Sequence, residues 1–388
     1  MDGIGLSLRT AQSQHLLINI YQRDADDFYT GYVQAVADDG VVLHTYNDAG
    51  LADGSAFVAM SVIDSIEVAG ADIDTMTYRM VRSEEKGFTA VPVTPLRLPL
   101  NVDSSLLYQV AENMRRTGQV VMAVTMDTET YLEGQITAVA EDSMQLDVFN
   151  KFNYSDHRSV QVDFSNLCAL EYEGYDLFLE TALMGKRAQL RHLASSRYRN
   201  VSEFRKLFGI AQQAKQLLAI TTRVNNDNFF VGRVQAVTND FVVLALLDMA
   251  GQFGGYSLIR LRNINAVITD SDYLQTVSFY ETWALQHHFV QAPLLNRERE
   301  FDTDDDVLRS IVAEAEIIGR VLRVRSAAVP EAITGSVVDV GDDAFTVIPL
   351  GAPASEGTRF KYVQVLDASF DSIYSYLQEE WLRDNDKE

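Results

Sequence analysis

The sequence predicts a mainly β protein of the α+β class, made of four tandem, strongly bent β-barrels with flanking helices. Two observations carry this prediction: a glycine motif returns at regular intervals, and amphipathic helical segments alternate with short apolar strand-like runs. The chain has 388 residues, more than one ordinary core accommodates, and 47% of them are hydrophobic. We therefore expect repeats at 1–100, 101–200, 201–300 and 301–388.

The glycine motif places one glycine between apolar residues, followed by a polar turn and a second β-rich run, as in FYTGYVQAVADDGVVL and FFVGRVQAVTNDFVVL. The four glycines are Gly31, Gly134, Gly232 and Gly335, spaced 103, 98 and 103 residues apart. Because glycine lets a strand bend sharply, we predict that these positions are structural and lie in the second strand of each barrel.

The flanks of each motif predict the remaining elements. Short apolar runs that begin at His15, Gln119, Gln216 and Glu316 are typical of first strands. Acidic or amide pairs follow each motif glycine where a tight turn is expected, and turn chemistry accounts for them. Amphipathic segments at 104–116, 201–215 and 305–315 predict helices before the second, third and fourth barrels.

This arrangement of motifs resembles the Sm-like family, which includes bacterial Hfq. In the third copy, GRVQAVTNDFVVL looks like the first Sm motif and IRLRNINAV, from Ile259 to Val267, looks like the second. Family members form rings and bind single-stranded RNA, so the resemblance implies a ring or partial ring within one chain. It also implies RNA contacts at Arg260, Arg262 and Asn263. The Lys-His pair of Hfq is absent from all four copies, and small barrels of the SH3-like type host many unrelated functions.

Composition restricts the partners. The chain has 32 basic and 55 acidic residues, a formal charge of −23, which repels DNA and anionic membranes at long range. No apolar run is long enough for a membrane span and the start lacks a secretory pattern, so we expect a cytoplasmic protein. The single cysteine, Cys168, lies between apolar neighbours and reads as a buried thiol.

One segment departs from the acidic balance. Between Glu180 and Glu203 the chain has no acidic residue and five basic ones: Lys186, Arg187, Arg191, Arg197 and Arg199. Arg187 and Arg191 are four apart and would share one helical face, so this segment is the best candidate for binding RNA or another polyanion. The alternative is a solvated linker helix whose arginines pair with acidic neighbours.

Enzyme motifs do not stand out. The sequence has no nucleophile elbow, P-loop or dinucleotide fingerprint, and its histidines lack metal-ligand spacing. We therefore expect no catalysis, no cofactor and no metal. The leading hypothesis is a binding or assembly protein with a protein partner or self-association. The alternatives are a single-stranded RNA binder and a module that holds a small ligand or peptide between repeats.

Overall fold

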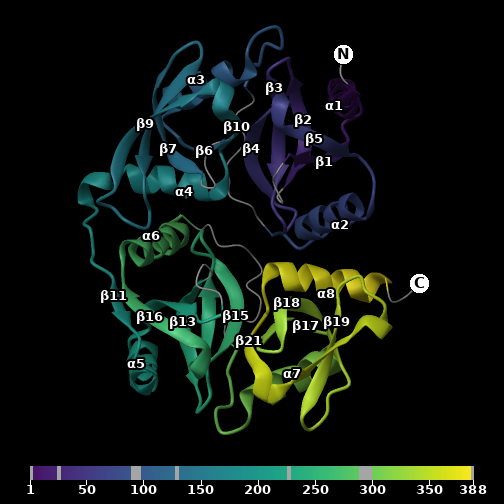
Figure 1. The fold of residues 1–388 in the computed structure, drawn as a ribbon, viewed down its shortest axis with the longest axis vertical. Coiled ribbons are helices and arrows are strands. Elements are labelled where there is room, and N and C mark those ends of the chain that lie inside the picture. The colour runs from purple at the N-terminus through teal and green to yellow at the C-terminus, as the bar shows by residue number, and fades with distance from the viewer. Residues whose placement is uncertain are drawn as a thin grey trace. The chain divides into compact units, whose positions relative to one another are not determined.

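The computed structural model describes residues 3–23, 28–88, 98–126, 131–224, 229–287 and 299–385, and one order of elements occurs four times in them (Figure 1). A helix is followed by four strands, a one-turn 3-10 helix, a fifth strand and a closing helix. We call each series a repeat. The mixed α and β composition is as predicted, and every motif glycine lies in the second strand of its repeat.

The first two repeats follow this order without additions. Repeat 1 consists of α1 (Gly3–Gln14), β1 (Leu17–Gln22), β2 (Phe28–Val36), β3 (Gly40–Tyr46), β4 (Ala52–Ala59), η1 (Met60–Val62), β5 (Ile63–Glu67) and α2 (Ala71–Glu85). Repeat 2 consists of α3 (Leu106–Thr117), β6 (Val120–Thr125), β7 (Leu132–Val139), β8 (Ser143–Phe149), β9 (His157–Asp163), η2 (Phe164–Asn166), β10 (Leu167–Tyr172) and α4 (Tyr175–Met184).

The last two repeats add short elements. A 3-10 turn η3 (Arg187–Gln189) and the strand β11 (Ser196–Tyr198) precede repeat 3. Repeat 3 consists of α5 (Val201–Ala214), β12 (Leu217–Thr222), β13 (Phe229–Val237), β14 (Phe241–Leu247), β15 (Phe253–Arg260), η4 (Leu261–Asn263), β16 (Ile264–Asp270) and α6 (Asp272–Gln286). Repeat 4 consists of α7 (Val307–Ile318), β17 (Val321–Ser326), β18 (Val329–Val338), β19 (Ala344–Pro349), η5 (Ala354–Glu356), β20 (Thr358–Lys361), η6 (Tyr362–Gln364), β21 (Val365–Phe370) and α8 (Ile373–Asn385).

The repeats join in pairs. The chain divides into two compact units, Met1–His192 (unit 1) and Leu193–Glu388 (unit 2). Unit 1 has one antiparallel sheet in the order β5-β1-β2-β3-β4-β10-β6-β7-β8-β9, and unit 2 has the order β11-β16-β12-β13-β14-β15-β21-β17-β18-β19-β20. In both units the fourth strand of one repeat pairs with the fifth strand of the next, as in β4 with β10. The described pairings thus give two continuous antiparallel sheets, each shared by two repeats, and the four tandem barrels stay a prediction.

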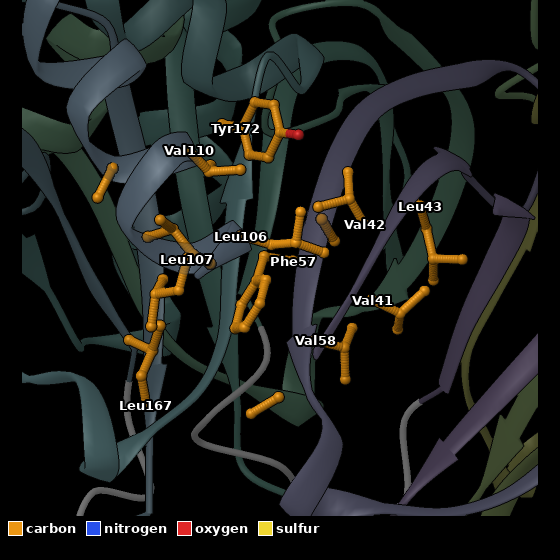
Figure 2. Packing of buried hydrophobic residues seen from close by; sticks show 14 of the residues in the cluster. Val41, Val42, Leu43, Phe57, Val58, Leu106, Leu107, Val110, Leu167 and Tyr172 are labelled. Carbon is orange, nitrogen blue, oxygen red and sulfur yellow. The ribbon is translucent and has the colours of Figure 1, made fainter. Parts of the chain in front are cut away.

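The hydrophobic cores follow the same pairing. In unit 1 a single apolar cluster contains residues of both repeats, and Leu106, Leu107 and Val110 of α3 pack against the strands that carry Val42 and Phe57 (Figure 2). In unit 2 a cluster joins strands of repeat 3 to repeat 4 in the same way. Since the first helix of the second repeat covers strands of the first, neither repeat of a pair buries its apolar face alone.

The motif glycines permit close approach of two strands. A Cβ on Gly31 would meet the carbonyl oxygen of His44 on the third strand of the repeat, and the other three glycines face the equivalent carbonyls. Those three contacts are Gly134 with Asp147, Gly232 with Ala245 and Gly335 with Ile348. Any side chain at these positions would push the second and third strands apart.

One strand prediction was wrong. The apolar run beginning at Glu316 was expected to start the first strand of repeat 4, but α7 continues to Ile318 and β17 starts at Val321. Gly319 ends the helix in the left-handed conformation, with φ of 69°. Ile317 is 80% exposed, so its apolar character did not indicate a buried strand position. None of the helices in the described ranges is long and apolar enough to cross a membrane.

Candidate functional site

The junction between the two repeats of unit 1 contains a cavity of about 490 Å³. It forms where the β2–β3 turn, the start of α3 and the η2 turn come together. Its lining residues are Asp39, Phe57, Ala59, Ser61, Ser105, Leu107, Glu141, Asp142, Asp163, Phe164, Ser165 and Leu167. The cavity is the strongest candidate site in unit 1, because it combines room for a ligand with convergent polar groups.

Backbone hydrogen bonds fix the turns around this junction. In each repeat, the second residue of the polar turn accepts a hydrogen bond through its carbonyl from the first N–H of the one-turn helix, or η element. These bonds are Met60 N to Asp39 O, Phe164 N to Asp142 O, Leu261 N to Asp240 O and Tyr362 N to Asp343 O, at 2.8 to 3.1 Å. The acidic side chains therefore project from a fixed backbone rather than from a free loop.

Asp39 connects the two repeats through its side chain. Its Oδ2 accepts hydrogen bonds from Ser105 Oγ at 2.8 Å and from the backbone N–H of Leu107 at 3.1 Å. Ser105 is the N-cap of α3 and accepts in turn from Tyr108 N. The other oxygen, Oδ1, is shielded from solvent and has no hydrogen-bond partner among the described residues. This oxygen can therefore accept a hydrogen bond from a ligand.

All the charged residues that line the cavity are acidic. Four carboxylates line it, from Asp39, Glu141, Asp142 and Asp163, together with three serine hydroxyls, and none of its lining residues is basic. Unit 1 as a whole has 13 basic and 28 acidic residues. Such a wall attracts a cation, and its Phe57 ring adds an apolar surface.

Unit 2 has a counterpart of about 410 Å³ at the junction of repeats 3 and 4. Its wall is mixed: it contains Asp240 and the acidic stretch 304–306, but also Arg260 and Arg309. Arg309 lies over the ring of Tyr362, with 4.7 Å between the guanidinium carbon and the ring centroid. Internal arginines thus offset the acidic groups here.

Two of the three residues that the Sm-like resemblance assigns to RNA, Arg260 and Arg262, contact repeat 4 at this second junction. Arg260 is 8% exposed and donates from Nε to Val365 O at 2.6 Å and from Nη2 to Tyr362 O at 2.7 Å. Arg262 donates to Val363 O, and Asn263 is buried. Burial, with Arg262 adding to it, lowers the pKa of Arg260. Both guanidinium groups contact the backbone of repeat 4, so RNA contact by these residues stays a prediction.

The basic segment is not one helix. Arg187 lies in η3, the chain is extended by Leu190, and Arg197 lies in β11, so the predicted shared helical face of Arg187 and Arg191 is wrong. Arg187 Nη1 forms an ion pair with Asp147 at 2.7 Å, as the alternative interpretation expected. The segment also divides between the units: Lys186, Arg187 and Arg191 belong to unit 1, whereas Arg197 and Arg199 belong to unit 2 and are exposed.

A buried ion cluster in unit 1 lies apart from the cavity. Lys151, 3% exposed, bridges Glu133 at 2.8 Å and Glu180 at 3.6 Å. Burial raises the pKa of Glu180 well above its ordinary value, and Glu133 adds to the rise. Burial alone would lower the pKa of Lys151, but the two carboxylates raise it. The three side chains are buried, and their ion pairs form a network inside unit 1.

Two further carboxyls are perturbed near the pairing of β4 with β10. Burial raises the pKa of Glu171 to about 7, although Tyr29 donates a hydrogen bond to its Oε1 at 2.5 Å. Burial also raises the pKa of Asp53 to about 6, against the effect of the N–H of Tyr175. These groups can make the stability of unit 1 depend on pH.

Other chemistries find little support in the described part of the chain. No group of three or more His, Cys, Asp or Glu side chains is arranged there to hold a metal ion. Burial raises the pKa of the Cys168 thiol, which disfavours the reactive thiolate.

Sequence reasoning missed the cavity of unit 1. It treated Asp39 as turn chemistry, although the carboxylate also binds the next repeat. The one relevant signal in the sequence was Ser105, which is recognisable as the N-cap of a helix and has a hydroxyl that can donate a hydrogen bond. Nothing in one repeat read alone could have paired the two, because they lie 66 residues apart in sequence.

Comparisons with known proteins add no family. No family model matches the chain, and no curated protein does. Among solved structures, the four MBT repeats of Drosophila melanogaster Sfmbt in complex with the peptide RHR(me)KVLR match at 10% identity and a TM-score of 0.12. The match covers 91% of this chain and 87% of that chain. A TM-score this low establishes no shared fold, and the resemblance to Sm-like proteins stays a prediction.

Proposed function

We propose that the protein is a non-enzymatic binding protein whose unit 1 cavity holds a basic segment of a polypeptide partner. The observation that carries the proposal is the lining: residues with four carboxylates, three hydroxyls and two phenyl rings surround about 490 Å³, and none of them is basic. A cationic side chain with an apolar stem fits such a wall, because its charge meets the acids and its methylenes meet the ring.

The non-enzymatic part of the proposal rests on the chemistry of the same wall. It offers carboxylate and hydroxyl groups, which suit the recognition of a cation, and no histidine, cysteine or lysine lines it. The rigid turn backbone supports recognition, since binding there immobilises few additional groups.

The test is fluorescence anisotropy with labelled peptides of equal length that are basic, neutral or acidic, together with oligo-U and oligo-A RNA. We expect only the basic peptides to bind, with an affinity that falls as salt rises. Replacing Glu141, Asp142 and Asp163 by their amides should weaken that binding by about tenfold or more.

A matched control keeps the charge change and moves it away from the cavity. Asp64, Glu84 and Glu85 are exposed acids of unit 1 outside the lining, and their amide substitutions should leave binding within about a factor of two. Equal losses in both triple variants would mean that net charge alone attracts the peptide. Binding of RNA in place of basic peptides would overturn the proposal in favour of a polyanion role.

A further inference from the structure

The two units contain the same junction built twice, so each can be read against the other. From the second strand onward, elements of repeat 1 recur in repeat 3 at a distance of 201 residues, as in β4 (Ala52–Ala59) and β15 (Phe253–Arg260). By this equivalence Asp39 corresponds to Asp240, and Ala59 corresponds to Arg260. The last pair is the important one, because a methyl group in unit 1 stands where unit 2 has a guanidinium.

In unit 2 the guanidinium is surrounded by acceptors of the next repeat. It donates to the carbonyls of Tyr362 and Val365, at 2.7 and 2.6 Å. Its Nη1 lies 3.9 Å from Asp240 Oδ2. Its carbon lies 4.2 Å from the centroid of the Phe241 ring. The junction of unit 2 therefore contains a complete guanidinium site that is filled from within the chain.

In unit 1 the acceptors remain and the donor is missing. The η2 turn (Phe164–Asn166) corresponds to η6 (Tyr362–Gln364), so Phe164 and Leu167 carry the equivalent carbonyls, and both residues line the cavity. The equivalent acid, Asp39, has one shielded oxygen without a hydrogen-bond partner among the described residues. The residue at the position of Arg260 is Ala59, whose side chain has no donor for these acceptors.

The aromatic wall is also retained, from a different position. Gly40 corresponds to Phe241 and has no ring of its own. A Cβ on Gly40 would meet the ring of Phe57, which comes from the neighbouring strand β4 and lines the cavity. Phe57 thus places a phenyl ring at the junction of unit 1, as Phe241 does at the junction of unit 2.

We propose that the cavity of unit 1 takes an arginine side chain from a partner polypeptide, which provides in trans the guanidinium that Arg260 provides in cis in unit 2. This inference rests on the proposed function and specifies its ligand. Arginine is preferred over lysine, because a planar fork donates to two carbonyls and a carboxylate at once and lies flat against a ring, whereas an ammonium group is a compact, strongly hydrated point charge.

The decisive variant fills the cavity from within. Ala59→Arg should place its guanidinium against the Phe164 and Leu167 carbonyls and exclude the ligand, while Ala59→Met should exclude it by volume alone. Ser65→Arg, on the exposed face of β5, changes the charge equally and serves as the control. The probes are labelled glycine-rich peptides with three arginines, three lysines or three citrullines, measured by anisotropy with the full chain.

We expect the arginine peptide to bind about tenfold more tightly than the lysine peptide, and the neutral citrulline peptide not to bind. Both substitutions at Ala59 should abolish arginine binding, with the Ser65→Arg protein unchanged. Equal binding of the arginine and lysine peptides, lost in the Glu141, Asp142 and Asp163 amide variant, would overturn the arginine inference and leave the proposed function standing. Binding of neither peptide would overturn both. Retained arginine binding in a folded Ala59→Met protein would place the ligand elsewhere.

Discussion

Ser105, the N-cap of the first helix of repeat 2, donates a hydrogen bond to Asp39 in the β2–β3 turn of repeat 1. This bond crosses the boundary between repeats and acts together with the β4–β10 pairing and a shared core. We therefore expect the pair of repeats, rather than the single repeat, to be the cooperative folding unit.

The first prediction follows from that pairing. Residues 1–192 and 193–388, expressed separately, should each fold with a cooperative thermal transition seen by circular dichroism, because each contains its own core clusters. Residues 1–100 alone should not fold, since α3 would be missing from the face that it covers. A cooperative transition in the 1–100 fragment would contradict this account.

A second prediction concerns the motif glycines. Gly335→Ala should lower the free energy of unfolding by about 2 kcal/mol or more, because its Cβ would meet the carbonyl of Ile348. The control is Gly209→Ala in α5, where a Cβ meets nothing within 4 Å. This change should stabilise by about 0.5 to 1 kcal/mol through helix propensity. Chemical denaturation of both variants provides the comparison, and equal effects would refute the role of the close strand contact.

A third prediction concerns Arg260. Arg260→Ala should destabilise unit 2 by about 2 to 4 kcal/mol, because two carbonyls lose a charged donor and the Phe241 ring loses its cover. Arg262→Ala should cost less than about 1 kcal/mol, since Arg262 is exposed. Denaturation of the 193–388 fragment measures both values. Similar small losses would indicate that Arg260 is free for another role.

A fourth prediction concerns the buried ion cluster. Lys151→Met removes the cation that pairs with both Glu133 and Glu180, and leaves two buried carboxyls together. We expect a loss of about 3 to 5 kcal/mol near neutral pH. Adding Glu180→Gln should recover part of that loss, because it removes one of the uncompensated carboxyls. No recovery in the double variant would contradict the electrostatic explanation.

A fifth prediction concerns pH. The folded pKa of Glu171, about 7, lies above its ordinary value of 4.5, so the folded state binds a proton more tightly than the unfolded state. The stability contributed by the protonated form is therefore complete below about pH 4.5 and is lost as the pH rises through 7. Asp53 acts in the same direction up to about pH 6.

Glu171→Gln should accordingly flatten the fall in melting temperature of the 1–192 fragment between pH 5 and 8. Glu84→Gln, at an exposed acid, should leave the slope as it is. A slope that is unchanged in the Glu171 variant would assign the pH dependence to other groups.

The sequence was informative about what each repeat must do by itself. The strand that contains Gly232 could be predicted from local sequence. A glycine between apolar residues, together with the turn after it, defines a single hairpin. Glu316 shows the limit: the run of apolar residues after it fits a strand or the last turn of a helix, and only Gly319 decides between them. The basic segment failed for a similar reason, since spacing at Arg187 and Arg191 implies a shared face only if the backbone is helical.

The candidate site was out of reach because it depends on contacts between repeats. Arg260 was singled out from the sequence by its position in a motif, but its hydrogen-bond partners lie about a hundred residues further along the chain. Ala59 attracted no attention, although it lines the unit 1 cavity at the position where Arg260 lines the cavity of unit 2.

The exchange of Ala59 for Arg260 at otherwise matching junctions has an evolutionary reading. The string Gly-x-Val-Gln-Ala-Val stands at both Gly31 and Gly232, as the duplication of an ancestral two-repeat block would leave it. After such a duplication one copy can keep an arginine that stabilises the junction, while the same position in the other copy is free to change. A single difference at this position, alanine in one copy and arginine in the other, then separates a junction that the chain satisfies with its own side chain from one that we propose a partner completes.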